Sequence, residues 1–155
     1  MKRKETILIG ADHGGFSLKE KLKSYLLKQG FSVKDVGTHS SERCDYPEFA
    51  ARLAALISRG AYRRGLLICK SGIGNAIVAN RFPGVRAALC YTLRSARLSR
   101  EHNDSNVLVL GSLFVKEPLA RRMVNLWLKT KFMGGRHNRR LNQIRRIERE
   151  LKEKR

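Results

Sequence analysis

Apolar residues along the chain gather in short runs that alternate with segments of helical periodicity. Five runs predict buried strands, at residues 6–12 (TILIGAD), 31–37 (FSVKDVG), 65–69 (GLLIC), 85–90 (VRAALC) and 106–111 (NVLVLG). Apolar positions three or four residues apart predict helices over 16–30, 47–60, 74–82, 93–102 and 118–132. The polar stretch 38–46 (THSSERCDY) is typical of a loop.

This alternation of strands and helices predicts an α/β protein. Strands as apolar as these are usually covered on both faces, and right-handed crossovers between them give a parallel sheet in a three-layer α/β/α fold. Ligands of such folds bind beyond the carboxyl ends of the strands. Asp12 and Cys69 stand at such ends, whereas His102 follows a helix, so topology alone does not bring it to the same place.

The last segment, 136–155, is predicted to be a charged helix. Leu141, Ile144, Ile147 and Leu151 form a narrow apolar stripe along it. A stripe this thin indicates packing on another surface, which is either the chain's own domain or a partner subunit. The pattern alone slightly favours the chain's own domain.

Composition narrows the class of protein. A chain of 155 residues with 42% hydrophobic residues fits one globular domain. It has no run of 18 apolar residues and no apolar signal core at its start, so no transmembrane helix is predicted and the cytoplasm is the expected location. Three cysteines without CxxC spacing make a disulfide scaffold or a thiolate zinc site a poor interpretation.

The net charge of +20 has two competing explanations, nucleic-acid binding and a general surface bias that suits anionic substrates. Segment 136–155 holds nine Lys or Arg and three Glu, and the rest of the positive charge is scattered. No basic stripe with interleaved aromatic residues and no RNA-binding signature is present, which disfavours nucleic-acid binding as the main function.

The motif CKSGIG (69–74) joins a strand to a helix N-terminus. Free backbone amides and the helix dipole stabilise negative charge there, and the two glycines let a ligand approach the backbone. The loop therefore suits a phosphate or a developing oxyanion, and the nearby cation Lys70 is expected to help lower the pKa of the Cys69 thiol. The alternative is a tight turn with a buried cysteine. The GK[ST] ending of a P-loop is absent.

Three further motifs carry candidate chemistry. In GADHGG (10–15), Asp12 suits sugar hydroxyls and His13 suits proton transfer, although Asp12 could simply cap a helix. His102 and Asn103 follow a helix, where a lone histidine is often idle. Arg136 and Arg140 share one helical face, which suits a phosphate or is only a solvated basic surface. Together these groups describe a metal-free isomerisation through an enediolate.

Five ordered motifs, GADHGGFSLKEKL, GTHSSERCDYP, LLICKSGIG, SREHNDSNVLVLGS and GGRHNRR, resemble ribose-5-phosphate isomerase B, the family that also holds the galactose-6-phosphate isomerase subunits. The resemblance implies a Rossmann-like α/β/α sandwich with a five-stranded parallel sheet. It implies a single sugar-phosphate isomerase domain over 1–155 whose helix 136–155 packs on the partner subunit. It also implies homodimers, sometimes tetramers, with composite active sites and no cofactor or metal.

The resemblance further implies roles for individual residues. Cys69 is the base that moves a proton between C1 and C2, and Ser71 with the amides of residues 70 to 74 holds the enediolate oxygen. His102, with Asp12 nearby, helps to open the furanose ring. The remaining substrate-binding residues fall into three groups: His13, Arg136 and Arg140 for the phosphate, with the two arginines reaching across from the other subunit; Tyr46 and Asn103 for the sugar; and Lys70, Gly72, Ile73 and Gly74 in the loop.

The chain departs from the family pattern at three positions. Leu113 stands where many members have an arginine in the phosphate site, and Lys70 stands where glycine is usual. Asn75 stands where some members use a glutamate base, which favours the cysteine mechanism. Lys70 could point to solvent, lower the pKa of Cys69, or replace the missing arginine; we favour the second role over the third.

The expected function is interconversion of D-ribose 5-phosphate and D-ribulose 5-phosphate in the non-oxidative pentose phosphate pathway. One alternative is an isomerase of a six-carbon sugar phosphate (allose or galactose 6-phosphate) or of a free aldose, which Leu113 favours. The other is a basic RNA-binding module on the same fold.

Overall fold

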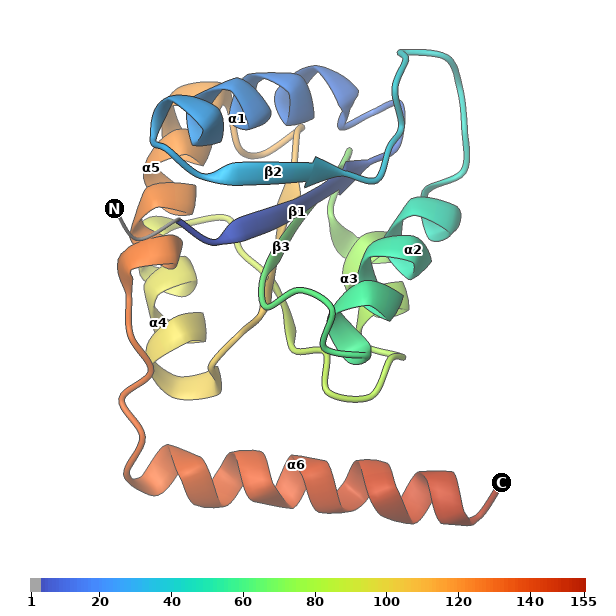
Figure 1. Ribbon diagram of the computed structural model, residues 1–155, viewed down its shortest axis with the longest axis vertical. Coiled ribbons are helices and arrows are strands. Elements are labelled where there is room, and N and C mark those ends of the chain that lie inside the picture. Colours follow the sequence, from blue (N-terminus) through green and yellow to red (C-terminus); the bar gives the residue numbers. More distant parts are fainter. Residues whose placement is uncertain (1–3) are drawn as a thin grey trace.

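A parallel sheet lies at the centre of the computed structural model, which describes residues 4–155 (Figure 1). All its strands run in the same direction, in the order β2-β1-β3-β5-β4. The five strands are β1 (Thr6–Ala11), β2 (Ser32–Asp35), β3 (Gly65–Cys69), β4 (Ala87–Leu89) and β5 (Val107–Gly111). The predicted α/β fold and its strands are confirmed, with β2 and β4 shorter than predicted because they are edge strands with one neighbour each.

Helices follow the strands as predicted, and their ends carry recognisable signals. They are α1 (Phe16–Lys28), α2 (Tyr46–Ser58), α3 (Ile73–Ala79), α4 (Leu93–Asn103), α5 (Glu117–Lys129) and α6 (Arg136–Glu153). Pro47 stands in the first turn of α2, where its missing N–H costs nothing. Gly30 and Gly60, with φ of 85° and 77°, end α1 and α2 in the left-handed conformation that glycine tolerates best.

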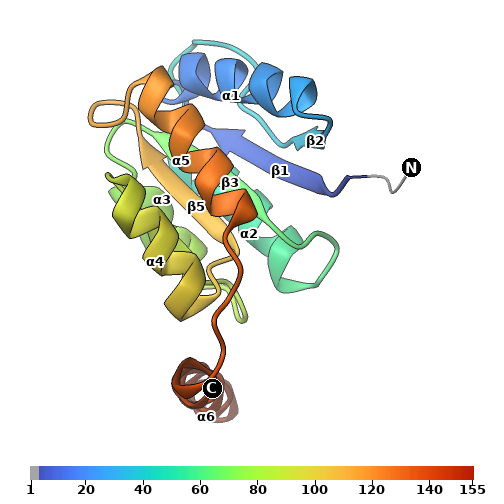
Figure 2. The same ribbon diagram turned by 90° about the vertical axis from the view of Figure 1, so that its left-hand side faces the viewer.

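Helices cover both faces of the sheet, which makes three layers (Figure 2). Helices α1, α4 and α5 pack on one face, where the largest side chain is the fully buried Trp127. Helices α2 and α3 pack on the other face, on Leu8, Leu67 and Val109. Because successive strand residues point to opposite faces, β1 sends Ile7 and Ile9 to the first cluster and Leu8 to the second.

Helix α6 lies apart from these layers (Figures 1 and 2). It touches its own chain through the buried side chains of His137 and Leu141, and the carboxylate of Glu148 accepts a hydrogen bond from the amide of Gly84. The rest of its apolar stripe is open to solvent, with Ile144, Ile147 and Leu151 42%, 52% and 60% exposed. Docking on its own domain is therefore limited to part of the helix. None of the helices in residues 4–155 is long and apolar enough to cross a membrane.

Candidate active site

The loop after β3 holds Cys69 in a fixed position at the carboxyl edge of the sheet. The thiol is buried, and the amide of Gly72 donates a hydrogen bond to its Sγ over 3.1 Å. Gly72 has φ of 83°, a left-handed conformation that turns the chain sharply into α3. The amides of Ser112 and Leu113 donate to the carbonyls of Cys69 and Lys70, so the neighbouring strand braces the loop from behind.

A cavity of about 460 Å³ opens in front of this loop. Its lining includes seven of the predicted site residues together with one that sequence analysis missed: Asp12, Tyr46, Cys69, Lys70, Ser71, Ile73, Gly74 and Ile77. The missed residue, Ile77, lies one helical turn after Ile73, and both are about half exposed. The available signal was the position of Ile77 in the short predicted helix 74–82, four residues after Ile73 of the loop.

Asp12 and His13 are both anchored at the end of β1. Oδ1 of Asp12 accepts a hydrogen bond from the amide of Gly15 over 3.1 Å, which is the capping contact considered from the sequence. Nδ1 of His13 lies 3.0 Å from the carbonyl oxygen and 3.2 Å from the amide nitrogen of Cys44. The polar loop thus orients the His13 ring, whose Nε2 has no hydrogen-bond partner within residues 4–155.

Two long side chains close over glycines at the rim of the cavity. The ring of Tyr46 lies so close to Gly74 that any side chain there would collide with it. The aliphatic stem of Lys70 lies in the same way over Gly14. Lys70 therefore borders the cavity instead of extending freely away from the protein.

The environment of Cys69 keeps its thiol protonated. Burial raises the pKa of Cys69, hydrogen bonds from the amides of Gly72 and Asn75 oppose that rise, and the negative charge of Asp12 adds to it. The expectation that the loop lowers this pKa is wrong. The reason is that the loss of hydration outweighs the stabilisation that the amides provide.

Sequence analysis also gave no role to the side chain of Asn75. It is 1% exposed, and neither its amide nitrogen nor its oxygen has a hydrogen-bond partner within residues 4–155. A buried amide without a partner lowers stability by about 1–3 kcal/mol. The signal in the sequence was its spacing of four residues from the buried Ala79, which places a polar side chain on the inner face of α3.

The other predicted site residues lie at the opposite edge of the sheet. His102, near the end of α4, stacks on His137 of α6 with ring centroids 4.3 Å apart. Asn103 ends α4, and Arg136 and Arg140 are exposed on α6. Strand β5 runs from this edge to the level of Cys69, so its five residues put roughly 15 Å between the two groups. Within one chain, His102 therefore does not lie near Asp12.

These residues nevertheless form a positively charged group. The pKa of His137 is lowered by burial and then by the charges of His102, Arg136 and Arg140. Leu113, where an arginine was expected, is 59% exposed at the other edge and supplies no charge. No cluster of three His, Cys, Asp or Glu side chains within residues 4–155 is arranged to hold a metal ion.

The chain is similar to known proteins over most of its length. The family model described as Ribose/Galactose Isomerase matches residues 7–144. Ribose-5-phosphate isomerase B of Escherichia coli K12 is 46% identical over 142 residues, which cover 92% of this chain and 95% of that protein.

Solved structures show the same similarity in three dimensions. The ribose-5-phosphate isomerase B of Clostridium thermocellum superposes with a TM-score of 0.92 at 46% identity, over 94% of this chain and 99% of that one. The enzyme of Mycoplasma genitalium with bound ribulose-5-phosphate gives a TM-score of 0.90 at 38% identity, over 94% of this chain and 97% of the other.

Proposed function

The chain belongs to the ribose/galactose isomerase family, and we propose that it interconverts D-ribose 5-phosphate and D-ribulose 5-phosphate, as an intramolecular oxidoreductase. The observation that carries this proposal is the position of Cys69. Its buried sulfur lies 3.1 Å from the amide of Gly72, in a cavity lined by Asp12, Ser71 and Tyr46. A base and oxyanion donors are thus held side by side, as an enediolate reaction requires.

In the proposed reaction, the Cys69 thiolate removes the proton from C2 of the open-chain aldose. The C2–H electron pair forms the C1=C2 bond, and the negative charge moves to the C1 oxygen, where Ser71 and the amides of residues 70 to 74 stabilise it. The C2 hydroxyl proton passes to the C1 oxygen, and return of the proton from Cys69 to C1 then leaves the carbonyl at C2 and a hydroxyl at C1. The raised pKa of Cys69 makes its thiolate a stronger base towards the weakly acidic C–H, at the cost of a smaller thiolate fraction at neutral pH.

We further propose that the working site is composite. His102 for ring opening, Asn103 for the sugar, and Arg136 with Arg140 for the phosphate lie too far from Cys69 to act in the same chain. A second chain could supply them if the two chains pack as a homodimer, with His13 completing the phosphate site. The uncovered apolar side chains of Ile144, Ile147 and Leu151 support α6 as the dimerisation helix.

An isomerase assay tests the function directly. Purified chain is incubated with ribose 5-phosphate, allose 6-phosphate, galactose 6-phosphate and free ribose, and ketose formation is followed by absorbance. We expect the highest kcat/KM with ribose 5-phosphate. Faster turnover of a six-carbon sugar phosphate or of free ribose would favour the alternative that Leu113 suggests, and no ketose from any sugar would leave the binding-module alternative.

The proposal includes a place in the non-oxidative pentose phosphate pathway and a cytoplasmic location. A phosphorylated sugar is charged and crosses a lipid bilayer poorly, so the enzyme has to work in the compartment that holds its substrate. Recovery of the activity in the cytoplasmic fraction of gently lysed cells is the expected result. Activity confined to another fraction would contradict it.

A further inference from the structure

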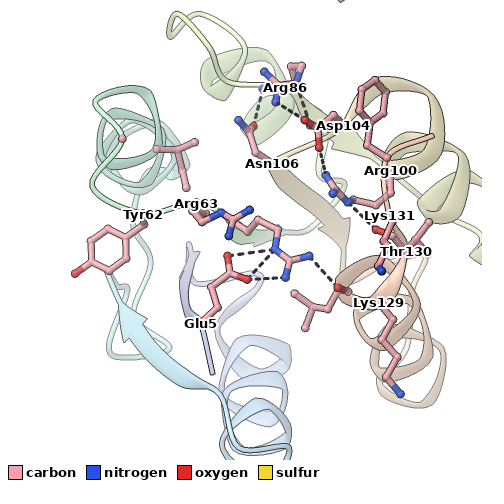
Figure 3. A pocket seen from close by; sticks show the side chains of 15 residues that line it. Glu5, Tyr62, Arg63, Arg86, Arg100, Asp104, Asn106, Lys129, Thr130 and Lys131 are labelled. Carbon is pink, nitrogen blue, oxygen red and sulfur yellow. Dashed lines mark hydrogen bonds and ion pairs between the residues drawn. The ribbon is translucent and has the colours of Figure 1, made fainter. Parts of the chain in front are cut away.

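A second cavity, of about 640 Å³, opens at the amino edge of the sheet (Figure 3). Its floor consists of the residues that directly precede four neighbouring strands: Glu5, Arg64, Asn106 and Arg86. They meet because the amino ends of parallel strands lie at one edge. None of the candidate active-site residues lines this cavity.

The lining is much more basic than the chain as a whole. Six of its 15 residues are Lys or Arg, against 33 of 155 in the chain, so the cavity is about twice as basic as the average. Its two carboxylates are those of Glu5 and Asp104. The surface bias of a chain with charge +20 therefore does not by itself account for this concentration.

Part of this charge has a structural explanation. Helices α2, α4 and α5 end beside this cavity, and their last carbonyl groups attract cations. Arg64 donates to the carbonyl of Leu128 over 2.9 Å, and Arg100 donates to the carbonyl of Thr130 over 3.3 Å. Glu5 pairs with Arg64, and Asp104 pairs with Arg100 (Figure 3).

These contacts do not neutralise the cavity. The six cations exceed the two carboxylates by four charges, and three helix ends offset about 1.5 of them, which leaves an excess of at most about 2.5, part of it on the exposed side chains of Arg63, Lys129 and Lys131. Arg63, Lys129 and Lys131 make no ion pair or side-chain hydrogen bond within the described part of the chain. Burial lowers the pKa of Arg86, and repulsion from Arg145 and Arg100 lowers it further against the attraction of Asp104.

We propose that this cavity binds a small phosphorylated anion at a site separate from the isomerase centre. Its volume lies within the range of small-molecule sites. The excess charge matches that of a phosphate ester or diphosphate, and a guanidinium fork fits phosphate oxygens in two-point contacts. Arg64 is held in place by Glu5 and Leu128, yet hydrogen-bond donors remain on both of its terminal nitrogens.

NMR titration of the 155-residue chain with inorganic pyrophosphate tests this site. We expect saturable chemical-shift changes at the backbone amides of Gly60, Asn106 and Thr130, which line the cavity. This expectation does not depend on whether pyrophosphate also shifts the amide of Gly72, near Cys69. The double variant Arg63→Ala, Lys131→Ala should weaken the affinity read from these amides by about tenfold and leave the isomerase kcat unchanged.

The matched control is Lys28→Ala, Lys34→Ala, which removes the same charge from exposed positions outside the cavity. It should leave the pyrophosphate affinity nearly unchanged. Equal weakening in both double variants would show only non-specific attraction by net charge, and the absence of shifts at Gly60, Asn106 and Thr130 would overturn the site. Neither result depends on whether the chain isomerises ribose 5-phosphate.

Discussion

The loop 69–74 and helix α6 carry the two halves of the candidate site, and the protein holds them in opposite ways. The loop is braced by the chain around the end of β5, and its carbonyls accept hydrogen bonds from the amides of Ser112 and Leu113 and from the hydroxyl of Tyr91. Helix α6 is mostly exposed and is held at His137, Leu141 and Glu148.

This difference distinguishes the part of the candidate site that is formed within one chain, the loop 69–74, from the part on α6, which lies away from it. The loop has its geometry before any ligand arrives, because strand pairing and backbone hydrogen bonds determine it. Helix α6 presents charged groups and an uncovered apolar stripe on the far side of the molecule. The comparison predicts that changes in the loop affect chemistry within one chain, and that changes in α6 affect assembly and the phosphate site.

The largest expected effect comes from Cys69→Ala. Removal of the base should lower kcat by about 10³-fold with little change in KM, since a general base acts on the transition state. Cys44→Ala is the control, because the contacts of Cys44 with His13 use its backbone atoms and survive the change. Steady-state kinetics and circular dichroism of both variants provide the measurement. Near-normal turnover in Cys69→Ala would remove this residue from the mechanism.

Subunit mixing tests whether α6 acts on a second chain. A mixture of Cys69→Ala chains with Arg136→Ala, Arg140→Ala chains should form heterodimers with about half of wild-type activity, because one of the two composite sites is intact. Mixing Cys69→Ala with Ser71→Ala chains is the matched control, and it should restore nothing, because both changes lie in the loop. Heterodimers verified by native mass spectrometry that stay inactive would place the arginines in the same chain as their Cys69.

Asn75→Leu, next to the loop 69–74, should raise the stability of the protein and lower its activity. Leucine keeps the branching of asparagine and removes the buried amide without partners, so the free energy of unfolding should rise by about 1–3 kcal/mol. We expect kcat to fall, because residue 75 lies in the first turn of α3, whose backbone amides contact the Cys69 sulfur. An apolar side chain there changes the surroundings of the base. Urea denaturation and kinetics measure the two effects. Lower stability would mean that the amide is satisfied in solution.

The smallest effect is expected from loss of the Lys70 charge. Lys70→Met keeps the stem over Gly14 and removes the charge. Because the pKa of Cys69 is set by burial, by backbone amides and by the charge of Asp12, with no contribution from Lys70, the rising limb of kcat/KM with pH should stay in place. A shift of that limb to higher pH would restore the role that the sequence favoured, and a raised KM for phosphorylated sugars alone would assign Lys70 to substrate binding. Lys70→Gly, which also removes the stem, separates packing from charge.

The sequence by itself was enough for the fold and for one half of the site. Strands and helices were predictable because apolar periodicity reflects burial, and burial in turn decides which faces pack. The positions of Asp12, Cys69 and Ser71 followed from the rule that parallel strands end at one edge. Their assignment to a sugar phosphate came from the ordered motifs, because periodicity carries no information about the ligand.

Only the tertiary structure decided the features that depend on distance and desolvation. It packed His137 of α6 against His102 and so held Arg136 at the opposite edge of the sheet from Cys69. It reversed the expected direction of the Cys69 pKa shift, because burial is a property of the packed loop. It also gathered residues from before four strands into one basic cavity, a grouping that no local motif records, because their order in the sheet differs from their order in the chain.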